Sequence, residues 1–195
     1  PTSFQDLLGR TLVSGQSLPP IYQKAVYEPY RTTLHRLGPD GFANIILEDP
    51  NHTGLAGLML DIGQAILQNG EGYEAQATDG FQEVVSDLYD GFLSEEDRHG
   101  VKHPDRGVLP PLVKWGRPRF GPYTFPVTAT SIFGVQAPIV NLPPTHAAGC
   151  LVGWSALAHE VSGHDILHAD TGLLAELGNL IAGALESAGQ SEDIA

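Results

Sequence analysis

Residues 100–144 limit the possible folds of this chain more than any other stretch. Nine of these 45 residues are proline. A proline inside a helix removes a backbone hydrogen bond and clashes with the turn before it, so helix is excluded over most of the stretch. Alternating and β-branched residues at 123–130 and 131–140 predict a hairpin or two edge strands. We expect this proline-rich, partly β segment to wrap across a buried helix.

Apolar residues recur at helical spacing on both sides of the proline-rich segment. A helix opened by Pro20 is expected to end at Gly38-Pro39, with a kink or split at Pro29. Apolar positions three and four residues apart predict further helices over 4–12, 55–67, 76–93 and 172–188. The predicted fold class is therefore mainly α, a helical domain with a central buried helix.

The composition is typical of a folded globular protein. Of the 195 residues, 42% are hydrophobic and 17% are charged, which is enough apolar material for one domain with its own core. We expect a single domain over 1–195. It comprises a helical part at 1–99, the proline-rich wrap at 100–144 and a helix pair at 145–188.

The net charge of the chain is strongly negative. Ten basic and 23 acidic residues give −13, which argues against nucleic acid or an anionic membrane as the main partner, because both are negatively charged themselves. Neither a run of 18 apolar residues nor a signal-peptide pattern occurs, so a soluble protein is expected. The start at Pro1 instead of Met suggests a trimmed chain.

One basic cluster stands out in this acidic sequence. Lys114, Arg117 and Arg119 lie within six residues. They could bind a substrate carboxylate, but we favour the interpretation in which they pair with the acidic surface of the protein itself.

The candidate site lies at 158–170, where the sequence reads AHEVSGHDILHAD and contains three histidines, one glutamate and two aspartates. An apolar run at 147–158 precedes it, and Thr145 can cap a helix N-terminus. We predict one long helix from Thr145 to Ala169, buried over its first half. Ionisable side chains on a buried helix need partners, and a bound metal ion satisfies histidines and a carboxylate together.

His159, Glu160 and His164 form the pattern H-E-x-x-G-H. Two histidines five residues apart lie about 140° apart around an ideal helix, so they cannot hold one ion unless the helix widens locally by one residue. Gly163 stands where such a π-type turn is tolerable, and π-turns are frequent at functional sites. With the wider turn, His159 and His164 share a face and Glu160 is placed as general base for a metal-bound water.

This motif resembles the zinc motif of the dipeptidyl-peptidase III family of metallopeptidases. The resemblance covers six residues and implies that His159 and His164 are zinc ligands and that Glu160 is the catalytic base. Members of that family take a third ligand from a downstream E-E-x-x-A-E helix, a motif that does not occur after His164 here. Glu176, on the next helix, is the substitute we expect, provided that the turn at 170–172 folds this helix back.

Two other sets of metal ligands are compatible with an undistorted helix. His164 and His168 have the H-x-x-x-H spacing with Asp165 between them, and Glu160, His164 and His168 line one face at successive steps of four. In the alternative without metal, these residues are polar members of a helix pair and Glu160 is hydrogen-bonded internally.

These patterns predict a zinc-dependent hydrolase, a metallopeptidase that acts on a peptide or a small-molecule substrate. The zinc ligands are His159 and His164, completed by Glu176 or His168, and Glu160 activates water. Iron or manganese also suits an imidazole and carboxylate set. The alternative from another class is a non-catalytic helical domain with a structural metal site or a buried His/Glu network.

Overall fold

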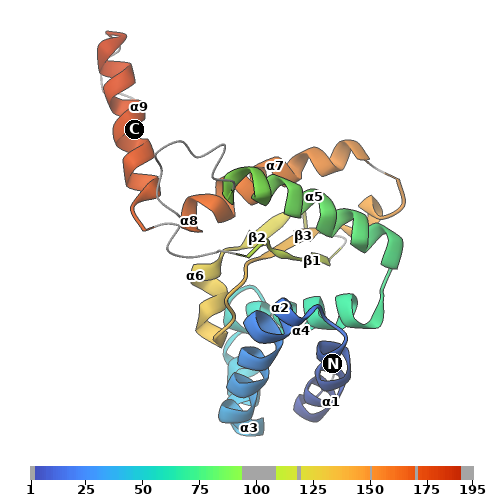
Figure 1. Ribbon diagram of the computed structural model, residues 1–195. Coiled ribbons are helices and arrows are strands. Elements are labelled where there is room, and N and C mark those ends of the chain that lie inside the picture. Colours follow the sequence, from blue (N-terminus) through green and yellow to red (C-terminus); the bar gives the residue numbers. More distant parts are fainter. Residues whose placement is uncertain (1–2, 94–108, 118–119, 150, 170, 190–195) are drawn as a thin grey trace.

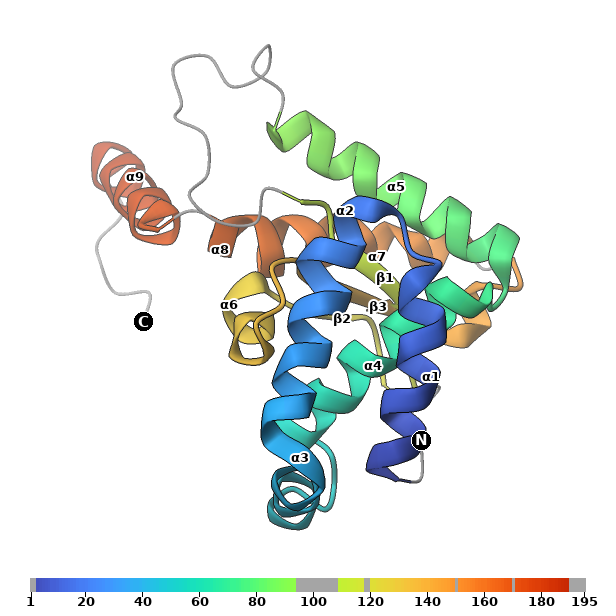
Figure 2. The same cartoon turned by 60° about the horizontal axis from the view of Figure 1, so that its bottom comes forward.

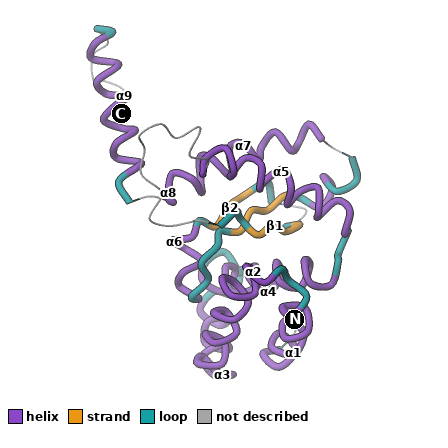
Figure 3. The backbone as a smooth tube through the Cα atoms, viewed as in Figure 1, coloured by secondary structure: helices purple, strands orange, loops and turns teal. Residues whose placement is uncertain are grey.

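The computed structural model describes residues 3–93, 109–117, 120–149, 151–169 and 171–189. Helices dominate it, so the prediction of a mainly α fold is confirmed. A small sheet lies in the middle, with the amino-terminal helices on one face and α5 (Ala75–Leu93) and α7 (Ala156–Val161) on the other (Figures 1 and 3). None of the described helices is both long and apolar enough to cross a lipid bilayer.

The amino-terminal layer consists of four helices that follow the predicted apolar pattern. α1 (Phe4–Gln16) begins at Ser3, whose hydroxyl accepts a hydrogen bond from the backbone N–H of Asp6. α2 (Pro20–Tyr22) continues through a π-turn (Gln23–Tyr27) into α3 (Glu28–Glu48), and α3 lies beside α1 in Figure 2. α4 (Leu55–Glu71) crosses beneath the sheet.

Pro29 does not split the second helix, contrary to our prediction. It lies just after the π-turn, and the backbone of Tyr27 and Glu28 before it is right-handed helical, so the helix continues past the proline. The predicted break at Gly38 does occur, because Gly38 has a φ of 65° and interrupts the helical backbone before Pro39.

α4 is the most deeply buried of these helices. Eleven of its residues are buried, among them Met59, Ile62 and Ile66, which pack against α1 and α3. Its start is fixed by Asp49, whose carboxylate accepts hydrogen bonds from the backbone N–H groups of Thr53, Gly54 and Ala56. The central buried helix of the fold is thus α4, and not the helix with the histidines.

The proline-rich segment supplies the sheet, and its strand β1 (Leu112–Trp115) packs against the buried helix α4. β1 pairs in parallel with β3 (Ile139–Leu142), and β3 pairs antiparallel with β2 (Tyr123–Phe125), in the order β1-β3-β2. Every residue of β1 and β3 is buried. The prolines stand outside these short strands, which leaves the ladder hydrogen bonds intact. The predicted partly β character of the segment is therefore confirmed, and the segment forms a layer between helices.

The strands predicted at 123–130 and 131–140 were right only at their ends. Tyr123–Phe125 and Ile139–Leu142 are strands, but the residues between them form α6 (Val127–Thr130) and a 3₁₀ turn (Ser131–Phe133). Thr130 stabilises this connection, because its buried hydroxyl donates to the carbonyl of Ala137.

The second face of the sheet is covered by α5 and α7. Phe81 of α5 packs against Trp115 of β1, and Leu157 and Val161 of α7 join the same apolar cluster. Because α7 presents only one face to this cluster, its other face is open to solvent.

The long buried helix predicted from Thr145 to Ala169 is interrupted. A 3₁₀ turn (Pro144–His146) ends before Gly149, whose φ of 110° is incompatible with a right-handed helix. Helical backbone resumes as a 3₁₀ segment (Leu151–Ser155), in which Leu151 and Val152 are exposed. The apolar first half is therefore a surface segment, and the expectation of burial was wrong.

Candidate metal centre

The predicted π-turn is present in the helix that carries the histidines. α7 passes into a π-helical turn (Ser162–Ile166) and then into α8 (Leu167–Ala169). The extra residue brings His159 and His164, five positions apart, to the same exposed side, while Leu157, Val161 and Asp165 face the core. An added Cβ at Gly163 would lie 3.6 Å from the His159 ring, so the turn leaves room beside that ring.

The two imidazoles meet through their Nε2 atoms, which lie 3.0 Å apart, with the rings nearly perpendicular at 85°. Two imidazole nitrogens bound to one tetrahedral zinc ion lie about 3.3 Å apart, since each Zn–N bond is about 2.05 Å. The 3.0 Å distance is also that of an N–H···N hydrogen bond, which the rings make when one of them carries its proton on Nε2. With both protons on Nδ1, the two Nε2 lone pairs face one another. The geometry that the spacing predicted is confirmed.

Glu160 adds a carboxylate to the pair. One ligand atom each from His159, Glu160 and His164 lies within 4.8 Å of the others, and this is the one such group within the described part of the chain. Glu160 is buried, and the Thr124 hydroxyl of β2 donates to its Oε2 atom over 2.8 Å. Its Oε1 atom makes no hydrogen bond with a described residue, so one oxygen is held and the other is available.

Thr124 is the residue of this site that sequence reasoning missed. It stands in the proline-rich stretch, 36 residues before Glu160. No local spacing connects the two residues, because their contact depends on α7 lying across β2.

Asp165 does not belong to the metal group. Its side chain is fully buried next to Tyr89 of α5, and burial raises the pKa of the Asp165 carboxyl to about 7, with Tyr89 opposing part of the shift. The structure therefore does not support the predicted alternative in which His164 and His168 bind the metal and Asp165 is the base.

Two predicted ligands lie outside the group. His168 is exposed on α8, and Glu176 is exposed in the first turn of α9 (Leu173–Ser187). We expected α9 to fold back against α7, but no residue of α9 is buried, and Figures 1 and 2 show it extending away from the sheet. Gly172, with a φ of 98°, precedes α9 and turns the chain in this direction.

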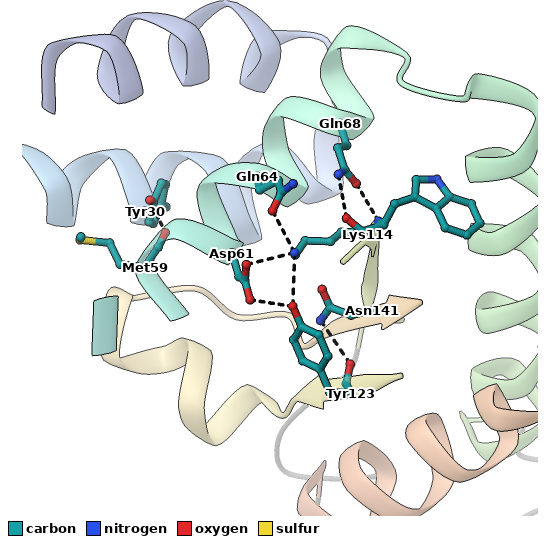
Figure 4. Close-up of polar contacts among 9 residues, drawn as sticks. Tyr30, Met59, Asp61, Gln64, Gln68, Lys114, Tyr123 and Asn141 are labelled. Atoms are coloured by element: carbon teal, nitrogen blue, oxygen red, sulfur yellow. Dashed lines mark hydrogen bonds and ion pairs between the residues drawn. The ribbon is translucent and has the colours of Figure 1, made fainter. Parts of the chain in front are cut away.

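The basic cluster also differs from the prediction. Lys114 is completely buried, and its ammonium group lies 3.0 Å from both Asp61 Oδ1 and Gln64 Oε1 and 3.4 Å from the Tyr123 hydroxyl (Figure 4). Burial lowers the pKa of Lys114, and the neighbouring Asp61 counteracts it. Lys114 thus pairs in the core and not on the acidic surface; Arg119 lies outside the described residues.

Comparison with known proteins adds no relative to this picture. No family model matches the chain, and no similar curated protein or solved structure is found.

Proposed function

We propose that this protein is a zinc-dependent hydrolase of the metallopeptidase type, with His159 and His164 as metal ligands and Glu160 as general base. The observation that carries the proposal is the 3.0 Å approach of the two Nε2 atoms across a π-turn, beside a buried carboxylate. The same turn explains how the H-E-x-x-G-H spacing, with its resemblance to the dipeptidyl-peptidase III motif, can serve one ion.

Bound zinc would polarise the substrate carbonyl and make a water molecule acidic enough to lose a proton near neutral pH. The free Oε1 of Glu160 then accepts that proton as the water oxygen bonds to the carbonyl carbon. Glu160 returns the proton to the amide nitrogen, and the C–N bond breaks to release a carboxylate and an amine. The hydrogen bond from Thr124 to Oε2 keeps the carboxylate turned toward the histidines throughout.

A zinc ion at this site would need a third protein ligand beside the two histidines. Catalytic zinc usually takes three protein ligands and one water. Glu160 is the third donor in the described group, whereas Glu176 and His168 remain sequence predictions. Glu160 cannot be a permanent ligand and the proton acceptor at once, so its role decides whether the site is catalytic or structural.

The Glu160→Gln variant tests this role. If Glu160 is the base, hydrolysis of a mixed peptide library falls by about a hundredfold or more, while zinc content measured by mass spectrometry stays at the wild-type level. Glu83→Gln is the matched control, because Glu83 is exposed on α5 and makes the same change in charge. Loss of zinc from Glu160→Gln would identify Glu160 as a ligand instead.

A non-catalytic helical domain is the second candidate, and one observation favours it: Glu160 is already hydrogen-bonded inside the protein. This candidate predicts that metal raises the melting temperature and that neither the wild type nor Glu160→Gln hydrolyses any peptide. Elemental analysis of the purified protein also distinguishes zinc from iron or manganese, the other metals that suit these donors.

A further inference from the structure

A cavity lies on the other side of β2 from the contact between Thr124 and Glu160. We call it the aromatic pocket; it has a volume of about 210 Å³ and is lined by His52, Thr53, Asp61, Arg117, Phe120, Tyr123 and Phe125. Phe120 and Phe125 both pack edge-on against Tyr123, so the three rings form a continuous apolar wall. Arg117 follows β1 and brings a guanidinium group to this wall.

The charges around the aromatic pocket do not balance. Arg117 is the cation and Asp61 the carboxylate of the pocket lining, and Asp61 is already paired with Lys114 of the neighbouring core cluster. Both Asp61 oxygens are already engaged, Oδ1 by Lys114 and Oδ2 by the Tyr123 hydroxyl. Among the residues that the structure describes, Arg117 has no carboxylate in ion-pair distance, and its recorded contact is the Phe120 ring, 5.6 Å from the guanidinium carbon.

The aromatic pocket and the metal group share one strand. Tyr123 and Phe125 are the chain neighbours of Thr124, whose hydroxyl holds Glu160. Successive side chains of a strand point to opposite faces, so the rings and the Glu160 contact lie on opposite sides of β2. β2 is an edge strand of the described sheet. An extended ligand at this edge can place one group in the pocket and the next toward the histidines.

We propose that the aromatic pocket binds a carboxylate that carries an apolar group, with the carboxylate paired to Arg117 and the apolar group among the three rings. Arginine suits this role because its planar guanidinium donates two parallel hydrogen bonds to a carboxylate. Two sources supply such a group, the C-terminal residue of a peptide and a free organic acid. The peptide source rests on the proposed function, whereas the carboxylate site itself does not.

Calorimetric titration of the metal-free protein in EDTA tests the proposal, because a chelated solution removes binding to the metal group. The probes are N-acetylglycylphenylalanine, the amide of the same dipeptide, phenylacetate and acetate. The dipeptide with a free carboxylate is expected to bind about tenfold more tightly than its amide, because the amide cannot form the charge-assisted ion pair with Arg117. Acetate, without an apolar group, is expected to bind more weakly than phenylacetate.

Arg117→Ala should raise the dissociation constant of the dipeptide acid by about tenfold or more. Arg117→Lys should raise it by less, because lysine keeps the positive charge but not the two parallel N–H donors of the guanidinium group. Arg10→Ala is the matched control, because Arg10 lies outside the aromatic pocket and its removal lowers the net charge equally. Equal effects of Arg10→Ala and Arg117→Ala in correctly folded variants would overturn the site, as would equal binding of acid and amide or binding of no probe.

The remaining outcomes separate the two sources. If phenylacetate binds as tightly as the dipeptide acid, the carboxylate site is supported and its assignment to a peptide C-terminus is overturned. If the dipeptide acid binds better but zinc-loaded protein hydrolyses no peptide, the proposed hydrolase function fails while the pocket stands.

Discussion

Two charged clusters flank β2, and they satisfy their side chains in opposite ways. On the α4 side, Lys114 and Asp61 are buried and bonded to each other, to Gln64 and to Tyr123 (Figure 4). On the α7 side, His159 and His164 are exposed and direct two ring nitrogens at one point beside Glu160. The first cluster is bonded through four buried or half-buried side chains, whereas the second joins two exposed imidazoles through their Nε2 atoms. Burial of charge alone therefore does not mark a functional site here.

The largest expected effect tests the buried cluster of Lys114 and Asp61. Lys114→Ala leaves the Asp61 carboxylate buried without its cation, which should lower the free energy of unfolding by about 3–5 kcal/mol in urea titrations. His164→Ala, at an exposed position, should change it by about 0.5 kcal/mol or less. The joint replacement Asp61→Leu with Lys114→Met should recover much of the loss. Equal destabilisation by Lys114→Ala and His164→Ala would remove the distinction between the clusters.

The next effect concerns Asp165, which lies behind the metal group. Its carboxyl titrates near pH 4 in the unfolded chain and near 7 in the folded one. Between these two pH values the folded state binds more protons than the unfolded state. The free energy of unfolding therefore falls by up to about 4 kcal/mol as pH rises from about 4 to about 7, and it stays level above pH 7. Urea unfolding in EDTA at pH 5 to 8 measures this. Asp165→Asn should lack the slope, and a wild-type curve that rises over this range would contradict it.

Zinc should stabilise the folded protein by binding to the group of His159, Glu160 and His164. A ligand that binds only the folded state at a hundred times its dissociation constant adds about 2.7 kcal/mol. The melting temperature should thus rise with zinc, fall again with EDTA, and not respond in His164→Ala or His159→Ala. A response that survives in both histidine variants would place the metal elsewhere.

The smallest expected effect concerns Thr124, the β2 residue that contacts Glu160 of the metal group. Thr124→Val removes the hydroxyl that donates to Glu160, at a stability cost of about 1 kcal/mol. If Thr124 positions the base, peptide hydrolysis should fall by about tenfold at unchanged zinc content and KM. Thr124→Ser, which retains the hydroxyl, should behave like the wild type. A purely structural Thr124 predicts equal activity in all three proteins.

Much of the local structure could be predicted from spacing. The helices at 55–67 and 76–93 appear as α4 and α5, and the π-turn follows from two histidines placed five apart with a glycine between them. The predictions failed where partners lie far apart in the chain. Thr124 meets Glu160 and Lys114 meets Asp61 across 36 and 53 residues, and neither pair leaves a local signal.

The sequence by itself determined the mainly helical fold and offered the convergence of His159 and His164 as one of three possible ligand sets, because helix periodicity depends on neighbouring residues alone. Only the tertiary structure decided that the proline-rich segment forms the central sheet, that α7 is half exposed and that α9 points away from the metal group. The physical reason is that strand pairing and layer packing are settled by burial between distant segments, and a pattern of residues along the chain does not specify which segments meet.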